Sequence, residues 1–207
     1  EEISIPGTVT TVGNSAFYRC KNLKNIEIPE GVTKIDGSAF IFCSSLEQIK
    51  LPQSLTSIGS GAFDNCTSLI SVELPDNAII SSDTFKECKN LSDIVISDTN
   101  NNYIVKNGIL YNKNITRILC YPAGIKDTEF FVPDTVKTIG DFAFYGAKVL
   151  ESINIPDSVT NIGTDAFGEC SGLKEAVIPD SVTTMGEAVF YKCTSLEKVK
   201  LSVNITS

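Results

Sequence analysis

The seven cysteines are the side chains here with the widest chemistry, because thiols bind metals, form disulfides and act as nucleophiles. A zinc site needs clustered pairs, which this spacing lacks. Neighbouring parallel strands would bring two cysteine Cα atoms within disulfide range, but their Cβ atoms would stay too far apart. We expect buried free thiols that pack as small apolar residues, with a disulfide or a metal site as the alternatives. Six of them stand three residues after a phenylalanine: Cys20, Cys43, Cys66, Cys88, Cys170 and Cys193.

The sequence offers little for catalysis. It has no histidine, which removes the commonest general base and every triad that contains one. No pair of carboxylates stands out for acid-base work, and phosphate-binding glycine loops and calcium loops are absent. The serine and threonine residues of the recurring Ser-Val-Thr are expected to hydrogen-bond to the backbone. We predict a protein with no catalytic residue, no cofactor and no metal.

The net charge of the chain excludes some classes of binding partner. The formal charge of −8 argues against nucleic acid and against anionic membranes, because both require a concentrated basic surface. No apolar run is long enough to cross a membrane, and the first residues do not read as a signal peptide. A protein ligand remains the predicted partner, without direct membrane insertion of this segment.

The cysteines belong to a 23-residue repeat that spans the chain. In "LKNIEIP" (23–29) apolar and polar residues alternate as in a short half-buried strand that proline ends. Seven residues after six of the seven repeat prolines stands a Gly or an Asp, which predicts a left-handed corner, as at Gly13 and Gly59. "SAFIFC" (38–43) predicts one helical turn. The markers of the repeat are Pro6, Pro29, Pro52, Pro75, Pro133, Pro156 and Pro179, with Phe17, Phe40, Phe63, Phe144, Phe167 and Phe190 eleven residues after six of them.

The pattern LxxIxIPxSVTxIGxxAFxxCxx resembles the BspA-like leucine-rich repeats of bacterial surface proteins. The resemblance implies an α/β-type, mostly β repeat: a right-handed, curved leucine-rich repeat solenoid with a parallel strand ladder on the concave face and short helical turns on the convex face. We expect residues 1–207 to form a single domain of about nine or ten coils, counting partial ones. Because both ends fall inside a repeat, we also expect a fragment or a trimmed mature chain.

One coil is irregular, from about residue 98 to 132. Its Asn107-Gly108 pair lies between apolar residues, a strong hairpin signal, and predicts strands at 103–105, 109–111 and 115–121. Cys120 falls here, outside the cysteine row, and is expected to be partly exposed. This coil is either a variant without a special role or a protruding contact surface.

The outward positions of each strand vary while the inward positions repeat. Such variation suits a binding surface on a fixed scaffold, although unconstrained surface positions would vary too. Val95 and Phe131 are apolar, which is unexpected at positions that face solvent. We expect them to form an apolar patch with Tyr111 and Tyr121. Glu2 is among the outward positions. The predicted protein-binding residues are Val95, Tyr111, Tyr121, Phe131, Glu73, Asp93, Asn154 and Glu175.

These observations predict a non-enzymatic protein-binding module. By resemblance it would lie at the cell surface or be secreted, and would mediate adhesion to host or extracellular-matrix proteins. A structural spacer within a larger surface protein and an intracellular scaffold are the alternatives.

Overall fold

The computed structural model describes residues 3–206, so the predicted outward position Glu2 lies outside the described part. The chain winds into a solenoid in which each regular coil carries one long and one short strand. The long strands are β2 (Asn25–Glu27), β4 (Gln48–Lys50), β6 (Ser71–Leu74), β8 (Asp93–Ile96), β12 (Glu129–Phe131), β14 (Ser152–Asn154), β16 (Glu175–Val177) and β18 (Lys198–Lys200). The short strands are β1 (Thr11–Val12), β3 (Lys34–Ile35), β5 (Ser57–Ile58), β7 (Ile79–Ile80), β13 (Thr138–Ile139), β15 (Asn161–Ile162) and β17 (Thr184–Met185). The irregular coil adds β9 (Tyr103–Lys106), β10 (Ile109–Asn112) and β11 (Arg117–Cys120).

Neighbouring coils pair in parallel, with residues 23 apart in register, as in Ile26 with Ile49, or 22 apart in the fourth coil, as in Val72 with Ile94. β2 and β4 bury their central isoleucine and expose the polar residue on either side, as the alternation of the sequence predicts. Serine hydroxyls bond to the preceding coil as expected: Ser54 Oγ donates to the Val32 carbonyl at 2.8 Å. The predicted mostly β solenoid is therefore confirmed, with eight long strands against the nine or ten coils expected.

The predicted helical turns are wrong, because the described residues contain no helix. In the segment from Ser38 to Cys43, Ser38 and Phe42 have left-handed backbones, with φ of 57° and 62°. The amides of Phe40 and Phe42 donate to Ala62 and Asp64 of the next coil, at 2.8 and 2.9 Å, instead of within their own turn. An α-helix needs consecutive residues with right-handed backbones and hydrogen bonds between residues four apart. Here alternate backbone amides donate to carbonyls of the next coil instead.

The recurring glycine also has a different role from the one predicted. Gly13 and Gly59 are not left-handed; the left-handed residue comes two positions later, at Ser15 and Gly61. A Cβ atom at Gly59 would lie 2.6 Å from the Gly37 nitrogen and 2.8 Å from the Asp36 carbonyl carbon. The glycine is needed because two backbones approach closely at this point.

The irregular coil folds as predicted into a hairpin. β9 and β10 are antiparallel, with Lys106 opposite Ile109, and Asn107 and Gly108 form the turn with φ of 52° and 77°. Positive φ at both turn residues is the geometry for which Asn-Gly is favoured. β11 pairs with β10 and, on its other edge, in parallel with β13, so the hairpin starts the second run of short strands.

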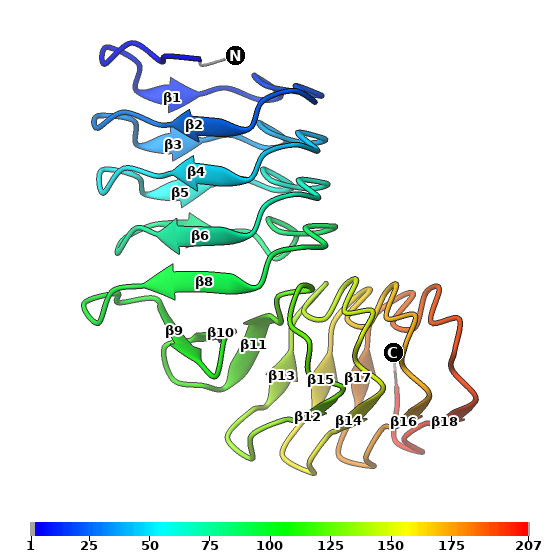
Figure 1. The fold of residues 1–207 in the computed structure, drawn as a ribbon. Helices are drawn as coiled ribbons and strands as arrows, with labels where there is room; N and C mark the ends of the chain where they lie inside the picture. Colours follow the sequence, from blue (N-terminus) through cyan, green and yellow to red (C-terminus); the bar gives the residue numbers. More distant parts are fainter. Residues whose placement is uncertain (1–2, 207) are drawn as a thin grey trace.

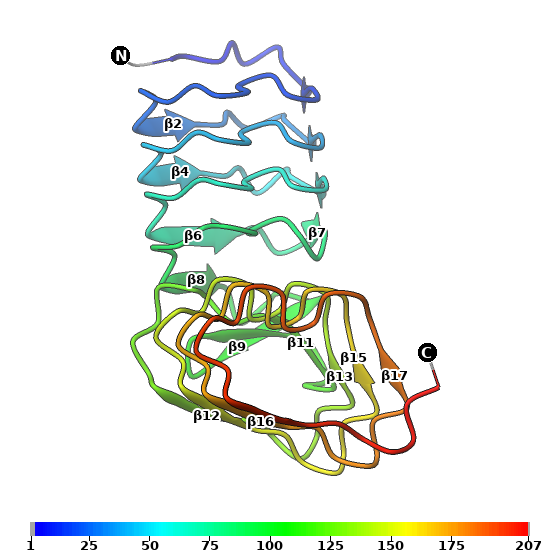
Figure 2. The same ribbon diagram turned by 90° about the vertical axis from the view of Figure 1, so that its right-hand side faces the viewer.

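The solenoid bends at this hairpin. Figure 1 shows one stack of coils ending at β8 and a second stack, from β11 to β18, running in a different direction; we name these the N-terminal and C-terminal stacks. The segments that connect the short strand to the next long strand meet at the inner side of the bend, which we name the inner corner, while the long strands lie away from it (Figures 1 and 2). The long strands predicted on a concave face therefore do not line the inner side of the bend.

The bend divides the core in two. One buried cluster extends from Val12 to Leu110 and a second from Ile109 to Val189. Inside each stack the repeated phenylalanines form a row, with ring centroids 4.8 to 5.9 Å apart in the N-terminal stack, where the row ends at Phe85. The row resumes with Tyr121, 5.0 Å from Phe144. Between Phe85 and Tyr121 the stacking is interrupted.

Candidate functional site

The exposed sides of the long strands form one surface on each stack, which we name the long-strand face. On it Glu73, Asp93, Asn154 and Glu175 are exposed, as predicted from the alternation. The two apolar members are also exposed, Val95 by 43% and Phe131 by 68%. A strand of three or four residues can point these side chains outward because the residue between them points into the core and holds the strand in place.

The two predicted tyrosines do not lie on this surface. Tyr111 and Tyr121 are each only 2% exposed, and burial raises the pKa of both to about 12. Tyr121 stacks on Phe144 and packs edge-on against Phe130 at 5.5 Å, so it takes the place of a repeat phenylalanine. Its position 23 residues before Phe144 is the sequence signal that indicates this role.

Val95 and Phe131 are not brought together into one patch. β8 belongs to the sheet of β6 and β8, whereas β12 belongs to the sheet of β12, β14, β16 and β18, and the two sheets lie on either side of the bend. Phe131 is in register with Asn154 of the next coil, and Val177, 43% exposed, occupies the same position one coil further. On the C-terminal stack the two apolar side chains Phe131 and Val177 thus stand on either side of Asn154, and we name this group the apolar patch.

Charges surround this patch. The first outward position of its strands carries Glu129 and Glu175, and the last strand carries Lys198 and Lys200. The face is therefore acidic beside Phe131 and basic at its far end. On the N-terminal stack the corresponding ladder carries an exposed ion pair, Glu27 with Lys50 at 2.5 Å.

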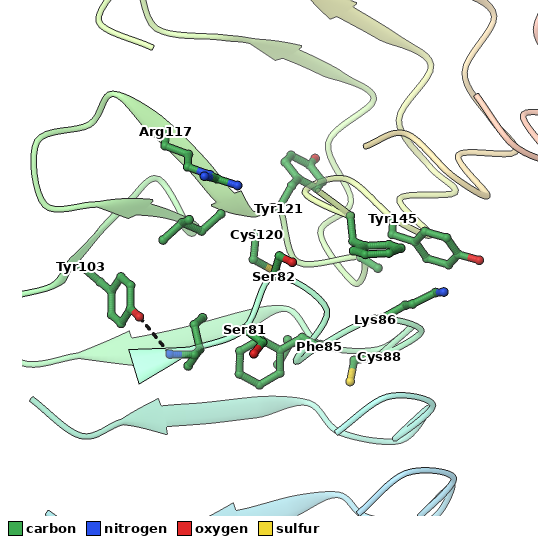
Figure 3. A pocket seen from close by; sticks show the side chains of 15 residues that line it. Ser81, Ser82, Phe85, Lys86, Cys88, Tyr103, Arg117, Cys120, Tyr121 and Tyr145 are labelled. Carbon is green, nitrogen blue, oxygen red and sulfur yellow. Dashed lines mark hydrogen bonds between the residues drawn. The ribbon is translucent and has the colours of Figure 1, made fainter. Parts of the chain in front are cut away.

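The bend also contains a cavity of about 310 Å³, which no motif of the sequence predicts, and we name it the junction cavity. Its walls come from the last coil of the N-terminal stack, the hairpin and the first turn of the C-terminal stack (Figure 3). Aromatic and aliphatic side chains dominate the lining, with the cations Lys86 and Arg117 on opposite sides. Tyr103 closes one edge, since its hydroxyl accepts a hydrogen bond from the Ile80 amide at 3.0 Å.

Polar contacts cross the inner corner beside this cavity. The Lys86 ammonium of the N-terminal stack lies 4.8 Å from the Phe142 ring centroid and 5.0 Å from that of Tyr145. Lys89 approaches Glu169 of the C-terminal stack at 3.9 Å. These contacts fix how the two stacks sit against each other, and part of them depends on ionised groups.

The cysteine row is built into the coils. Cys43, Cys66, Cys88 and Cys170 are buried, Cys20, Cys120 and Cys193 are half-buried, and all seven are free. Thiols of the row donate to a phenylalanine carbonyl of the preceding coil; in the C-terminal stack this bond runs from Cys170 Sγ to Phe144 at 3.0 Å. Burial raises the pKa of the Cys43 and Cys193 thiols to about 11 and that of Cys120 to about 12. The row therefore stabilises the coils and is poorly suited to nucleophilic chemistry.

Across residues 3–206, no cluster of three or more histidine, cysteine or acidic side chains is placed to hold a metal ion. In the same range there is no helix with the length and hydropathy that a membrane crossing requires.

Comparison with known proteins agrees with this architecture. The model of the "BspA type Leucine rich repeat region" matches residues 1–118 and 120–207, in six copies. No curated protein matches the sequence. A leucine-rich repeat protein from Eubacterium ventriosum is 25% identical with a TM-score of 0.67 over 93% of this chain. A leucine-rich cell surface protein from Faecalibacterium prausnitzii is 26% identical with a TM-score of 0.55 over 95% of this chain and 78% of its own.

The pneumococcal vaccine antigen PcpA has the same fold, with 24% identity and a TM-score of 0.78 over 89% of this chain. This chain spans 64% of the length of the Eubacterium protein and 52% of PcpA.

Proposed function

Because the chain belongs to the BspA-type leucine-rich repeat family, we propose that it is a protein-binding module that acts in adhesion at a bacterial cell surface. Its ligands would be host-surface or extracellular-matrix proteins. A similar solved structure is a cell surface protein and another is an antigen, which supports the location. Each stack presents side chains from successive coils on one surface, the arrangement that repeat proteins use to bind extended partners.

The observation that carries the proposal is the exposed Phe131. A phenylalanine ring that stays 68% exposed loses the burial that would stabilise the fold, whereas the neighbouring Phe130 is partly buried against the core. Exposed aromatic side chains on rigid strands are the usual anchors of protein interfaces. Val177 extends the apolar area along the ladder, and the rigid β12 to β18 sheet holds it in place.

The charges around this patch indicate the kind of protein that fits. Glu129 and Glu175 would pair with basic side chains around an apolar centre, so a partner with a lysine- or arginine-rimmed hydrophobic spot is complementary. Such rim charges mainly speed association and make it sensitive to salt.

Binding to a panel of immobilised extracellular-matrix proteins, measured by biolayer interferometry, tests the proposal. Phe131→Ser should raise the dissociation constant for the bound protein by about tenfold or more, the effect of losing one buried anchor. Tyr191→Ser is the matched control, since Tyr191 is 48% exposed on the same stack but outside the long-strand face. The control should bind like the wild type.

Two results would count against adhesion through this face. If no matrix protein binds, the module is a spacer or has a different class of ligand. If a protein binds but Phe131→Ser and Tyr191→Ser bind equally well, the contact lies elsewhere on the solenoid.

A further inference from the structure

The junction cavity lies where the row of aromatic rings is interrupted. Phe85 ends the row of the N-terminal stack and Tyr121 begins that of the C-terminal stack, and both line the cavity. Figure 3 shows them on opposite walls, with no ring between them. The interior of every other coil is filled by such a ring, so the cavity marks the position of a missing aromatic group.

The walls of the cavity are suited to a flat apolar body. Leu91 and Leu119 contribute aliphatic surface, and Phe142 and Tyr145 contribute aromatic surface on the side of the C-terminal stack. A volume of about 310 Å³ is at the small end of the range that ligand sites occupy. It accommodates one or two fused rings and excludes a polypeptide segment.

The polar groups of the lining favour a negative charge. The lining contains Lys86 and Arg117 and, within the part of the chain that the structure describes, no carboxylate. Arg117 contacts Asp141 through one terminal nitrogen at 3.6 Å, but its buried Nε has no hydrogen-bond partner among the described residues. The Lys86 ammonium lies over two aromatic rings, and Asp64 and Asp165 interact with its charge. An unsatisfied buried donor is costly, and an anion would satisfy it.

We propose that the junction cavity is a binding site for a small planar aromatic carboxylate. The ring of the ligand fills the break between Phe85 and Tyr121, and its carboxylate accepts hydrogen bonds from Arg117 near the mouth, where Ser82 is exposed. Because the walls come from both stacks, the bound ligand also joins the two cores across the bend. This site is separate from the long-strand face, so it does not depend on the proposed adhesion.

Isothermal titration calorimetry with two probes of nearly equal shape and opposite charge tests this site. Indole-3-acetate should bind with a dissociation constant of about 1 mM or below. A ligand with this number of non-hydrogen atoms can reach such an affinity. Tryptamine, which carries an ammonium group on the same ring, should bind at least about tenfold more weakly because its positive charge would meet the Arg117 guanidinium.

Variants locate the binding. Arg117→Gln should weaken indole-3-acetate binding by about tenfold, the cost of one charge-assisted contact. Arg19→Gln is the matched control, since Arg19 lies over Tyr18 and Phe42 in the N-terminal stack, away from the cavity. Ala123→Leu should abolish binding by filling the space that Ala123 borders.

Circular dichroism and the melting temperature establish that each variant is folded. If Ala123→Leu does not fold, Ser82→Trp, which closes the exposed rim, replaces it. Absence of indole-3-acetate binding, equal binding of tryptamine, or binding that survives both Arg117→Gln and the filling variant would each overturn the proposal.

Discussion

Two glycines at the same position of the repeat should respond in opposite ways to a single added methyl group. A Cβ atom at Gly59 would lie 2.6 Å from the Gly37 nitrogen, whereas a Cβ atom at Gly13 would meet nothing within 4 Å. Neither glycine has a left-handed backbone, so alanine is conformationally acceptable at both. The comparison Gly59→Ala against Gly13→Ala therefore isolates the effect of the spacing between coils.

The size of the change in unfolding free energy depends on whether the atoms around the added methyl group can move. At Gly59 the obstructing atoms are backbone, and the spacing is held by the bond from the Gly59 amide to the Ile35 carbonyl at 2.8 Å. Overpacking by a methyl group costs about 1–3 kcal/mol. Replacing glycine by alanine also lowers the conformational entropy of the unfolded chain, which stabilises the folded state by about 0.4–1 kcal/mol. We expect Gly59→Ala to lose roughly 1–2 kcal/mol of unfolding free energy, and Gly13→Ala to gain about 0.4–1 kcal/mol.

Urea unfolding followed by far-UV circular dichroism measures both values, and calorimetry gives the melting temperatures. For a chain of this length the loss at Gly59 corresponds to a fall of roughly 2–8 °C. If the two variants shift stability in the same direction by similar amounts, the close approach of coils does not explain the recurring glycine.

Two further predictions concern the titrating groups. Because burial raises the pKa of Cys43 and Cys193 to about 11, these two thiols should react slowly with a thiol reagent near neutral pH in the native protein. All seven thiols should react after unfolding. Fewer would indicate disulfides, each visible as a loss of two hydrogen masses. Lys192 donates a hydrogen bond to Glu169 at 2.8 Å, and this bond lowers the pKa of Glu169 in the folded state. The ionised Glu169 therefore stabilises the fold at pH values above the usual pKa of a glutamate. This stabilisation is lost as the pH falls through the lowered pKa. The difference in unfolding free energy between wild type and Glu169→Gln should then shrink from about pH 7 to about pH 3, and a constant difference would contradict the assignment.

The repeated letters of the sequence were enough to predict the coil. The spacing of proline, phenylalanine and cysteine predicts parallel strands around a buried row, and Asn107-Gly108 predicts the hairpin, because each of these signals acts through its nearest neighbours. The turn after Ser38 was misassigned for a physical reason. Its inward Ala, Phe and Cys have a spacing that also suits a helix, and only the hydrogen bonds to the next coil decide against it.

The bend and the cavity depend on contacts between distant segments. Lys86 meets Phe142 and Tyr145, more than 50 residues away along the chain, and no periodicity encodes such a pairing. The hairpin obscures the period, so the sequence around Tyr121 suggests a surface position, although counting back 23 residues from Phe144 assigns Tyr121 to the core. The predicted exposure of Phe131 needed only its own strand, and for that reason it was correct.

The interrupted row of rings has a mechanical consequence. Within a stack, pulling the ends apart must break a ladder of backbone hydrogen bonds and stacked rings, one coil after another. At the bend, the load is borne by the hairpin and by the backbone hydrogen bond from the Gly124 amide to the Leu91 carbonyl at 2.7 Å. Side-chain contacts such as that of Lys89 with Glu169 also bear it. A molecule under tension would therefore straighten at the bend before either stack unravels, so the hairpin acts as a compliant joint between two stiff rods.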